Sequence, residues 1–255
     1  MNTNSGVSRD PKRILTMFSA IAPRYDLGNH LLSFGMDLLW RRRAARAGLG
    51  PQTRRILDCC CGTGDLALAF ARRIGAGRDP LIVGCDFAQP MLAIARDKIR
   101  RLGAPIALAA ADTVALPFPD GAFDLVAAAF GLRNLADREA GLREMARVLR
   151  PGGAALILEF TTPRNSLFRA IYHFYFRRLL PLAARAATGS NEYGYLPASV
   201  AEFPSPGALC VLMERCGLRD ARYELLTGGI AAIHTAARPA GKEFAGPEGH
   251  AIHKV

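Results

Sequence analysis

The stretch RILDCCCGTGDLALAFARR, residues 55–73, joins a short apolar run, a turn with two glycines and an amphipathic helical pattern. This order is typical of a strand–turn–helix unit. Gly62 and Gly64 let the backbone approach a ligand closely and adopt positive φ angles. The free N–H groups at the start of the helix favour a polar or anionic ligand. The stretch therefore predicts a small-molecule site at the end of a buried strand.

The three consecutive cysteines, Cys59, Cys60 and Cys61, raise the alternative of a metal or redox centre. Neighbouring strand residues point to opposite faces, so three adjacent thiols on a strand cannot all face one ion. The chain has no C-x-x-C pair, and its other cysteines do not have ligand spacing. We therefore interpret the triplet as packed scaffold, because free cysteine packs as a small hydrophobe. No metal is expected.

Downstream, apolar runs and helical patterns continue to alternate. The helical patterns lie at 65–74, 89–101 and 137–149, and the apolar runs are LIVGCDF (81–87), PIALAAAD (105–112), FDLVAAAF (123–130) and AALILEF (154–160). Strand-length runs that alternate with helices predict a parallel sheet with helices on both faces. Two further strand patterns within 221–238 meet at Gly228-Gly229 and predict a C-terminal antiparallel hairpin. The predicted fold class is α/β, with a Rossmann-like, mostly parallel sheet.

Composition sets the limits of the domain organisation. The 255 residues carry 33 Lys and Arg against 22 Asp and Glu, a net charge of +11 that favours an anionic partner. The polar, basic start lacks the apolar core of a signal peptide, and no run reaches the roughly 18 apolar residues of a membrane-spanning helix. These features predict a cytoplasmic protein. We expect an N-terminal helical cap over the site (1–50), a cofactor-binding domain (51–238) with a helical insertion (about 164–202), and a disordered tail (239–255).

Carboxylates follow two of the predicted strands. Asp86 lies at the end of the second strand, 22 residues after Gly64, where a carboxylate suits the hydroxyls of a ribose. Asp112 follows the third strand, and Asp124 lies at the start of the fourth. A nicotinamide-binding fold would favour a third glycine, but Leu66 or Ala67 stands there. The pattern therefore favours another nucleotide-type cofactor.

These residues make the chain similar to the class I S-adenosylmethionine-dependent methyltransferases, whose first motif usually reads Asp-x-Gly-x-Gly-x-Gly, with Cys60 here in place of the first Gly. The likeness becomes more specific over about residues 12–237. The stretches MFSAIAPRYDLGNHLLSFGMDLLWRR, ADTVALPFPDGAFDLVAAAFGLRN, LREMARVLRPGGAALILEF and NEYGYLPASVAEFP resemble the ubiquinone/menaquinone biosynthesis C-methyltransferase family. The resemblance implies that S-adenosylmethionine methylates a ring carbon of a polyprenylated quinol. The first motif and GCDFAQPML resemble the menaquinone branch, and a ubiquinone precursor is the alternative acceptor.

The resemblance also implies the site residues. Cofactor contacts are expected from Asp58, Gly62, Thr63, Gly64, Asp86, Phe87, Asp112, Thr113 and Ala129, the last at a position where some relatives carry Ser. Substrate contacts are expected from Asn134, Glu159, Tyr193 and Tyr195.

The chemistry of the acceptor points to two catalytic candidates, Arg133 and Tyr25. A phenol with a pKa of about 10 is protonated at neutral pH, so the site must weaken or remove that proton. Arg133 follows the fourth strand, and its permanent charge suits stabilisation of an oxyanion. An alternative is that it only ties a loop to a helix. Tyr25, with Asp26 beside it, is expected to cover the site from the N-terminal helices, or else to end a helix.

The remaining expectations concern partners. The segment SLFRAIYHFYFRRLLPLAARAA (166–187) is aromatic and cationic, as in a helix at a membrane interface or a helix that covers the sheet with snorkelling arginines. We expect transient contact with the anionic inner face of the membrane, and homodimerisation is an open option. An RNA methyltransferase would have a dedicated RNA-binding module, and none is visible. A cofactor-binding scaffold without activity is the non-enzymatic alternative.

Overall fold

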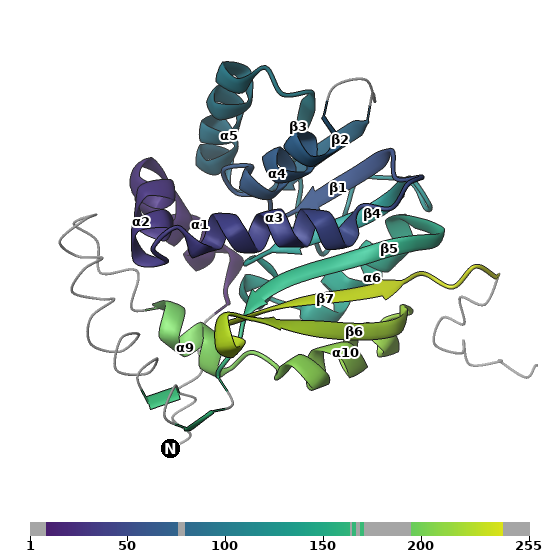
Figure 1. Cartoon of the computed structure of the whole chain (residues 1–255). Helices are drawn as coiled ribbons and strands as arrows, with labels where there is room; N and C mark the ends of the chain where they lie inside the picture. The colour runs from purple at the N-terminus through teal and green to yellow at the C-terminus, as the bar shows by residue number, and fades with distance from the viewer. Residues whose placement is uncertain (1–8, 76–79, 164, 167–168, 171–194, 242–255) are drawn as a thin grey trace, which may run out of the picture.

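A single seven-stranded sheet organises the chain (Figure 1). The computed structural model describes residues 9–75, 80–163, 165–166, 169–170 and 195–241. The strands are β1 (Arg55–Cys59), β2 (Leu81–Asp86), β3 (Ile106–Ala110), β4 (Phe123–Ala129), β5 (Leu149–Phe160), β6 (Arg219–Leu226) and β7 (Ala231–Ala237). Their order across the sheet is β3-β2-β1-β4-β5-β7-β6.

The strand directions confirm the predicted fold class. β1 pairs in parallel with β2 and β4, β2 with β3, and β4 with β5, whereas β7 runs antiparallel to both β5 and β6. The hairpin from β6 to β7 passes through the short 3₁₀ turn Thr227–Gly229, as the glycine pair predicts. The strand order reverses between β1 and β4, so a ligand crevice is expected at their carboxyl ends.

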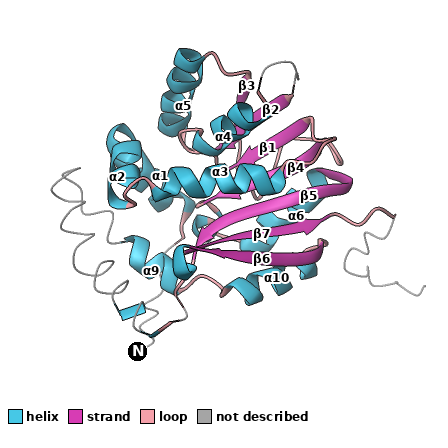
Figure 2. Ribbon diagram, viewed as in Figure 1, coloured by secondary structure: helices cyan, strands magenta, loops and turns pink. Residues whose placement is uncertain are grey.

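Helices cover both faces of the sheet (Figure 2). The helices are α1 (Pro11–Ile21), α2 (Tyr25–Leu32), α3 (Met36–Gly48), α4 (Asp65–Ile74), α5 (Gln89–Leu102), α6 (Arg138–Val148), α9 (Tyr195–Ala201) and α10 (Pro206–Arg215). Side chains of α3 and α4, including Trp40 and Phe70, share one core with Ile56. Side chains of α6 and α10, including Met145 and Met213, share the other core with Leu57. Adjacent residues of β1 thus face opposite cores, as strand geometry requires.

The N-terminal helices divide between two locations. α3 packs on the sheet, while α1 and α2 pack beside the loop after β2, where Ala22 and Tyr25 contact Ala88 and Met91. Of the predicted cap (1–50), only α1 and α2 therefore lie beside the loop after β2 among the described residues. Most of the predicted insertion and nearly all of the predicted tail lie outside the described residues.

None of the described helices is by itself long and apolar enough to cross a membrane. Together, α9 and α10 are long and apolar enough to span a membrane, but the two helices are bent by 69° relative to each other.

One histidine is buried within the sheet. His234 on β7 lies between Ile157 of β5 and Tyr223 of β6 and is 2% exposed. Burial lowers its pKa from 6.5 to about 4, although backbone groups of Ile157 and Pro206 act in the opposite direction. Because the folded pKa lies below the unfolded value, the unfolded chain binds an extra proton between these pH values.

We predict that His234 makes the protein less stable in acid. The difference between the two pKa values corresponds to about 3 kcal/mol of unfolding free energy, lost as the pH falls from 6.5 to below 4. Urea unfolding at pH 7.0 and 4.5 measures this loss, and His234→Phe should remove most of it. An identical pH dependence in the variant would contradict the assignment.

Candidate active site

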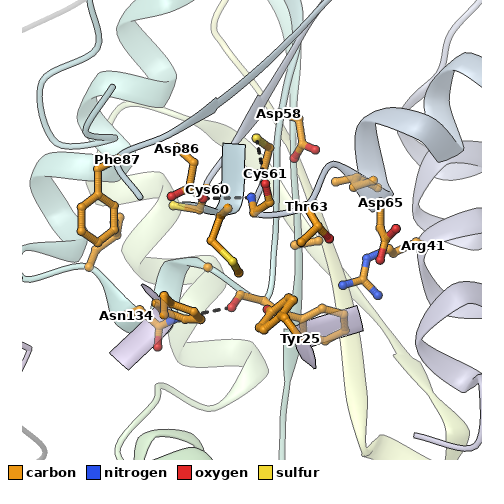
Figure 3. A pocket seen from close by; sticks show the side chains of 18 residues that line it. Tyr25, Arg41, Asp58, Cys60, Cys61, Thr63, Asp65, Asp86, Phe87 and Asn134 are labelled. Atoms are coloured by element: carbon orange, nitrogen blue, oxygen red, sulfur yellow. Dashed lines mark hydrogen bonds between the residues drawn. The ribbon is translucent and has the colours of Figure 1, made fainter. Parts of the chain in front are cut away.

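A pocket lies at the carboxyl ends of β1, β2 and β4 (Figure 3). Its empty volume is about 630 Å³, including the part open to solvent. Three parts of the chain line it. The N-terminal helices contribute Phe18, Tyr25 and Arg41. The ends of β1 and β2, with the loops and helix starts that follow them, contribute Asp58, Cys60, Cys61, Gly62, Thr63, Asp65, Leu66, Asp86, Phe87 and Met91. The end of β4 and the segment after it contribute Ala129, Phe130, Gly131, Asn134 and Leu135.

The Asp86 carboxylate connects two loops of this pocket. Its Oδ2 accepts a hydrogen bond from the Gly62 N–H at 2.8 Å, and its Oδ1 accepts one from the Ala88 N–H at 2.9 Å. Burial raises the pKa of Asp86, while these backbone donors act to lower it. Each carboxylate oxygen has a second lone pair, so Asp86 can hold the glycine loop and still accept from a ligand hydroxyl.

Asp58 has a free acceptor atom next to the pocket. Its Oδ2 accepts from the Ala67 N–H at 2.9 Å, but its buried Oδ1 has no hydrogen-bond partner among the described residues. Burial raises the pKa of Asp58 to about 8. A buried polar atom without a partner is costly, so a ligand that donates to Oδ1 gains by satisfying it. The amino group of an amino acid fits this requirement.

Cys60 takes a backbone conformation that favours glycine. Its φ is +51°, which continues into Gly62 at +55° and Gly64 at +83°. The triplet therefore leaves the strand after Cys59, and strand alternation does not govern Cys60 and Cys61. Both remain buried or half-buried free thiols whose pKa is raised well above the usual value by burial. Such protonated thiols suit scaffold better than redox chemistry or metal binding.

Gly131 is fitted against Cys60. A Cβ added at Gly131 would lie 2.3 Å from the Cys60 Cβ. The segment after β4 thus approaches the glycine loop as closely as the absence of a side chain allows. The Cys60 Sγ also lies 3.2 Å from the Thr113 Oγ1, which connects β1 to the segment after β3.

Arg41 places a positive charge in the pocket, and the sequence analysis does not identify it. Its Nη1 donates to Asp37 Oδ2 at 2.6 Å, and its guanidinium lies 5.0 Å from the centroid of the Phe130 ring. In Figure 3 the guanidinium points into the pocket near Asp65 and Thr63. Arg42 and Arg43 are exposed whereas Arg41 is buried. The spacing of Trp40, Arg41, Ala44 and Ala45 along one helix face is the signal that could have identified it.

A lysine joins the N-terminal helices to the glycine loop. Lys98 Nζ lies 2.6 Å from carboxylate oxygens of both Asp26 and Asp65, and Thr63 Oγ1 donates to Asp26 at 2.5 Å. Asp26, His30 and Asp65 lie close enough to share a metal ion, but Lys98 already supplies a positive charge there. The hydroxyl of Thr63 is therefore hydrogen-bonded to Asp26, and Thr63 also lines the pocket.

Arg133 and Glu159 form a buried ion pair outside the pocket lining. Arg133 Nη1 donates to Glu159 Oε2 at 3.0 Å and to the Phe130 carbonyl at 2.5 Å, and the Arg133 N–H donates to Glu159 Oε1 at 3.1 Å. This pair fixes the turn that brings Asn134 to the pocket. The charges of Arg133 and Arg41 act to lower the pKa of Tyr25, although burial raises it overall.

The other predicted residues are distributed unevenly. Tyr25, Asp58, Gly62, Thr63, Asp86, Phe87, Ala129 and Asn134 line the pocket, whereas Gly64, Asp112, Thr113, Arg133, Glu159 and Tyr195 do not. Asp112 accepts from the Val114 N–H, and the Tyr195 hydroxyl is buried without a partner among the described residues. Asp124 lies at the opposite edge of the sheet, where it accepts from the N–H groups of Arg54 and Arg55. Tyr193 lies outside the described residues.

The sequence matches one family model over nearly its whole length. Residues 7–238 match the ubiE/COQ5 methyltransferase family. The chain is 52% identical over 224 residues to a demethylmenaquinone methyltransferase from Thermus thermophilus, covering 88% of this chain and all of that protein. It is 49% identical to the ubiquinone/menaquinone biosynthesis C-methyltransferase UbiE of Geobacter sulfurreducens, covering 88% of each.

Solved structures with little sequence identity share the fold. An S-adenosylmethionine-dependent methyltransferase from Thermotoga maritima, described as a possible histamine N-methyltransferase, aligns with a TM-score of 0.60 at 18% identity, covering 88% of this chain and 98% of that one. Another from Aquifex aeolicus aligns with a TM-score of 0.57 at 17% identity, covering 77% and 88%. These likenesses support the fold of class I methyltransferases.

The contact between Cys60 and Gly131 generates a prediction about stability. Gly131→Ala should destabilise the protein by about 1–3 kcal/mol, because the new methyl group forces the two loops apart. Adding Cys60→Gly removes the opposing Cβ and should recover most of the loss. Thermal unfolding of both single variants and the double variant measures the coupling. Equal costs of Gly131→Ala with and without Cys60 would contradict the packing described here.

Proposed function

We infer that this chain, which belongs to the ubiE/COQ5 methyltransferase family, transfers the methyl group of S-adenosylmethionine to a ring carbon of a polyprenylated quinol. Demethylmenaquinol is the proposed main acceptor, because the relative at 52% identity over its full length is named for that reaction. The Geobacter relative is named for both the ubiquinone and menaquinone pathways, so a ubiquinone precursor is the second candidate. The pocket that joins Asp58, Asp86 and Arg41 is the observation that supports a cofactor of this type.

The pocket residues match the chemical groups of the cofactor. The free Oδ1 of Asp58 would accept from the amino group, and Arg41 would pair with the carboxylate of the same amino-acid end. Asp86 would accept from the ribose hydroxyls. When bound, S-adenosylmethionine supplies an electrophilic methyl group on a positively charged sulfur.

The protein must make the quinol ring electron-rich. A hydroxyl with a pKa of about 10 ionises readily at neutral pH only where positive charge stabilises the anion. Arg41, which lines the pocket, is the proposed source of that charge. Arg133 acts as a positioning residue in this proposal, because its guanidinium is bound to Glu159 and Phe130 rather than exposed in the pocket. Tyr25 and Asn134, which line the pocket, are proposed to contact the quinol.

The acceptor would come from a membrane. A polyprenylated quinol is apolar, and the net charge of +11 suits transient contact with anionic headgroups on the cytoplasmic side.

Methyl transfer tests the function directly. Labelled S-adenosylmethionine is incubated under reducing conditions with a short-chain demethylmenaquinol, a benzoquinol precursor of ubiquinone, or bulk RNA. We expect label in menaquinol first, and a smaller amount in the benzoquinol. Label in RNA would contradict the acceptor class. Cofactor binding without transfer to any acceptor would instead favour a scaffold.

Arg41 should determine the affinity for the cofactor's carboxylate. Loss of a charge-assisted hydrogen bond costs about 1.5–3 kcal/mol, so Arg41→Gln should weaken S-adenosylhomocysteine binding roughly 10- to 100-fold. Calorimetry with the decarboxylated analogue provides the comparison, because its affinity should change little. Arg42→Gln, on the exposed face of α3, is the matched control. An equal loss for both ligands would show that Arg41 acts only through folding.

Arg133 should affect turnover more than cofactor affinity. Removing it alone leaves Glu159 buried without its partner, so the variant is made with Glu159→Gln. We expect Arg133→Gln/Glu159→Gln to retain S-adenosylhomocysteine affinity within about twofold while kcat falls at least about tenfold, because the turn that carries Asn134 loses its ion pair. The double variant removes one positive and one negative charge, so the pH dependence of kcat should change little. An unchanged kcat would contradict a positioning role for Arg133.

A further inference from the structure

Four large apolar side chains are exposed on α2, on α3 and in the turn between them. Leu27, Leu31 and Phe34 are 59%, 54% and 82% exposed, and Leu39 on α3 is 50% exposed. Leu27 and Leu31 are four residues apart and share one face of α2, and Phe34 lies in the turn that follows the helix. We call these four residues the α2 patch. The other exposed large hydrophobic side chains of the described chain lie far apart in sequence.

The turn after α2 holds Phe34 outward in a strained conformation. Phe34 has φ +52° and Gly35 has φ +72°. Hydrogen bonds from the Phe34 N–H to Leu31 O at 3.1 Å and from the Gly35 N–H to His30 O at 2.7 Å fix this geometry. A bulky residue with positive φ is unfavourable, and such strain is concentrated at functional sites. The exposed ring of Phe34 therefore lies on a turn that two backbone hydrogen bonds hold in place.

The surroundings of the patch are cationic. Residues 11–48 contain seven Lys and Arg against two acidic residues. Both of the latter, Asp26 and Asp37, are paired inside the structure with Lys98 and Arg41. Arg42 and Arg46 are exposed and follow Leu39 at i+3 and i+7, so they share its face of α3. Apolar side chains bordered by cations without free carboxylates suit an anionic lipid surface.

The same helix also borders the pocket. Tyr25, the first residue of α2, lines the pocket. Gly28 and Leu32 are on the buried face of the helix. In Figure 1, α2 lies to the left of the sheet, with α1 beside it. The exposed side chains Leu27 and Leu31 thus belong to the same helix as a residue that lines the pocket.

We propose that the α2 patch inserts into an anionic bilayer and brings the pocket next to the membrane that holds the acceptor. This inference rests on the proposed function for the identity of the acceptor, but the docking itself is independent of it. The apolar side chains enter the acyl boundary, and the arginines of α3 contact the headgroups. A quinol with a long prenyl chain could then enter the pocket directly from the bilayer, without passing through water.

Vesicle co-sedimentation tests the docking. The probes are vesicles of neutral phosphatidylcholine and vesicles that also contain anionic phosphatidylglycerol. Wild type should bind the anionic vesicles, and Leu27→Gln/Leu31→Gln/Phe34→Asn should lower that affinity at least tenfold. The matched control, Leu81→Thr/Leu102→Gln/Val211→Gln, replaces similarly exposed apolar side chains elsewhere and should bind as wild type. Arg42→Gln/Arg46→Gln should lose the preference for anionic vesicles.

Two further measurements separate the alternatives. Methyl transfer to a water-dispersed short-chain quinol should be unchanged in the α2 variant, while transfer to a long-chain quinol in vesicles should fall at least tenfold. Failure of all methyl transfer would contradict the proposed function but leave vesicle binding as an independent result. Vesicle binding by the α2 variant equal to that of wild type, or no binding by wild type, would overturn the proposal. So would a change from dimer to monomer in the α2 variant with vesicle binding retained.

Discussion

Two buried carboxylates hold the glycine loop on which the pocket depends. Asp86 at the end of β2 bonds to the Gly62 and Ala88 N–H groups, and Asp58 in β1 bonds to the Ala67 N–H at the start of α4. Each carboxylate therefore has a structural role before any ligand arrives. Burial disfavours the ionised form of both groups and so raises their pKa. Additional hydrogen-bond donors would stabilise the ionised form, and a ligand with an amino group and two hydroxyls provides such donors.

The N-terminal helices complete the site from the other side. Tyr25 and Arg41 reach into the pocket, and Asp26 joins Thr63 and Lys98. The opposite face of the same helices carries the apolar and cationic side chains of the α2 patch. One short segment thus contacts the cofactor pocket on one side and, in our proposal, the membrane on the other. This arrangement suits an enzyme whose cofactor is water-soluble and whose acceptor is not.

Local sequence patterns were sufficient to predict the sheet, the terminal hairpin and the position of Asp86, because strand runs and glycine turns depend on neighbouring residues. Contacts between distant segments were not predictable in this way. The close approach of Gly131 to Cys60 depends on the pairing of β1 with β4. The residues next to Gly131 and Cys60 in the sequence do not predict this contact. Arg133 has the right residue type beside the pocket, but Glu159 of the next strand binds it. Arg41 has the same side chain within a run of three arginines, and only its place on the buried helix face distinguishes it.

A crystal structure with S-adenosylhomocysteine tests the central claim most directly, because it locates every group of the cofactor at once. The account predicts the amino nitrogen at Asp58 Oδ1, the carboxylate at the Arg41 guanidinium and the ribose hydroxyls at Asp86, with the glycine loop unchanged. A ligand bound with its amino-acid end away from Asp58 and Arg41, or a loop rebuilt around it, would contradict the view that these carboxylates preform the site.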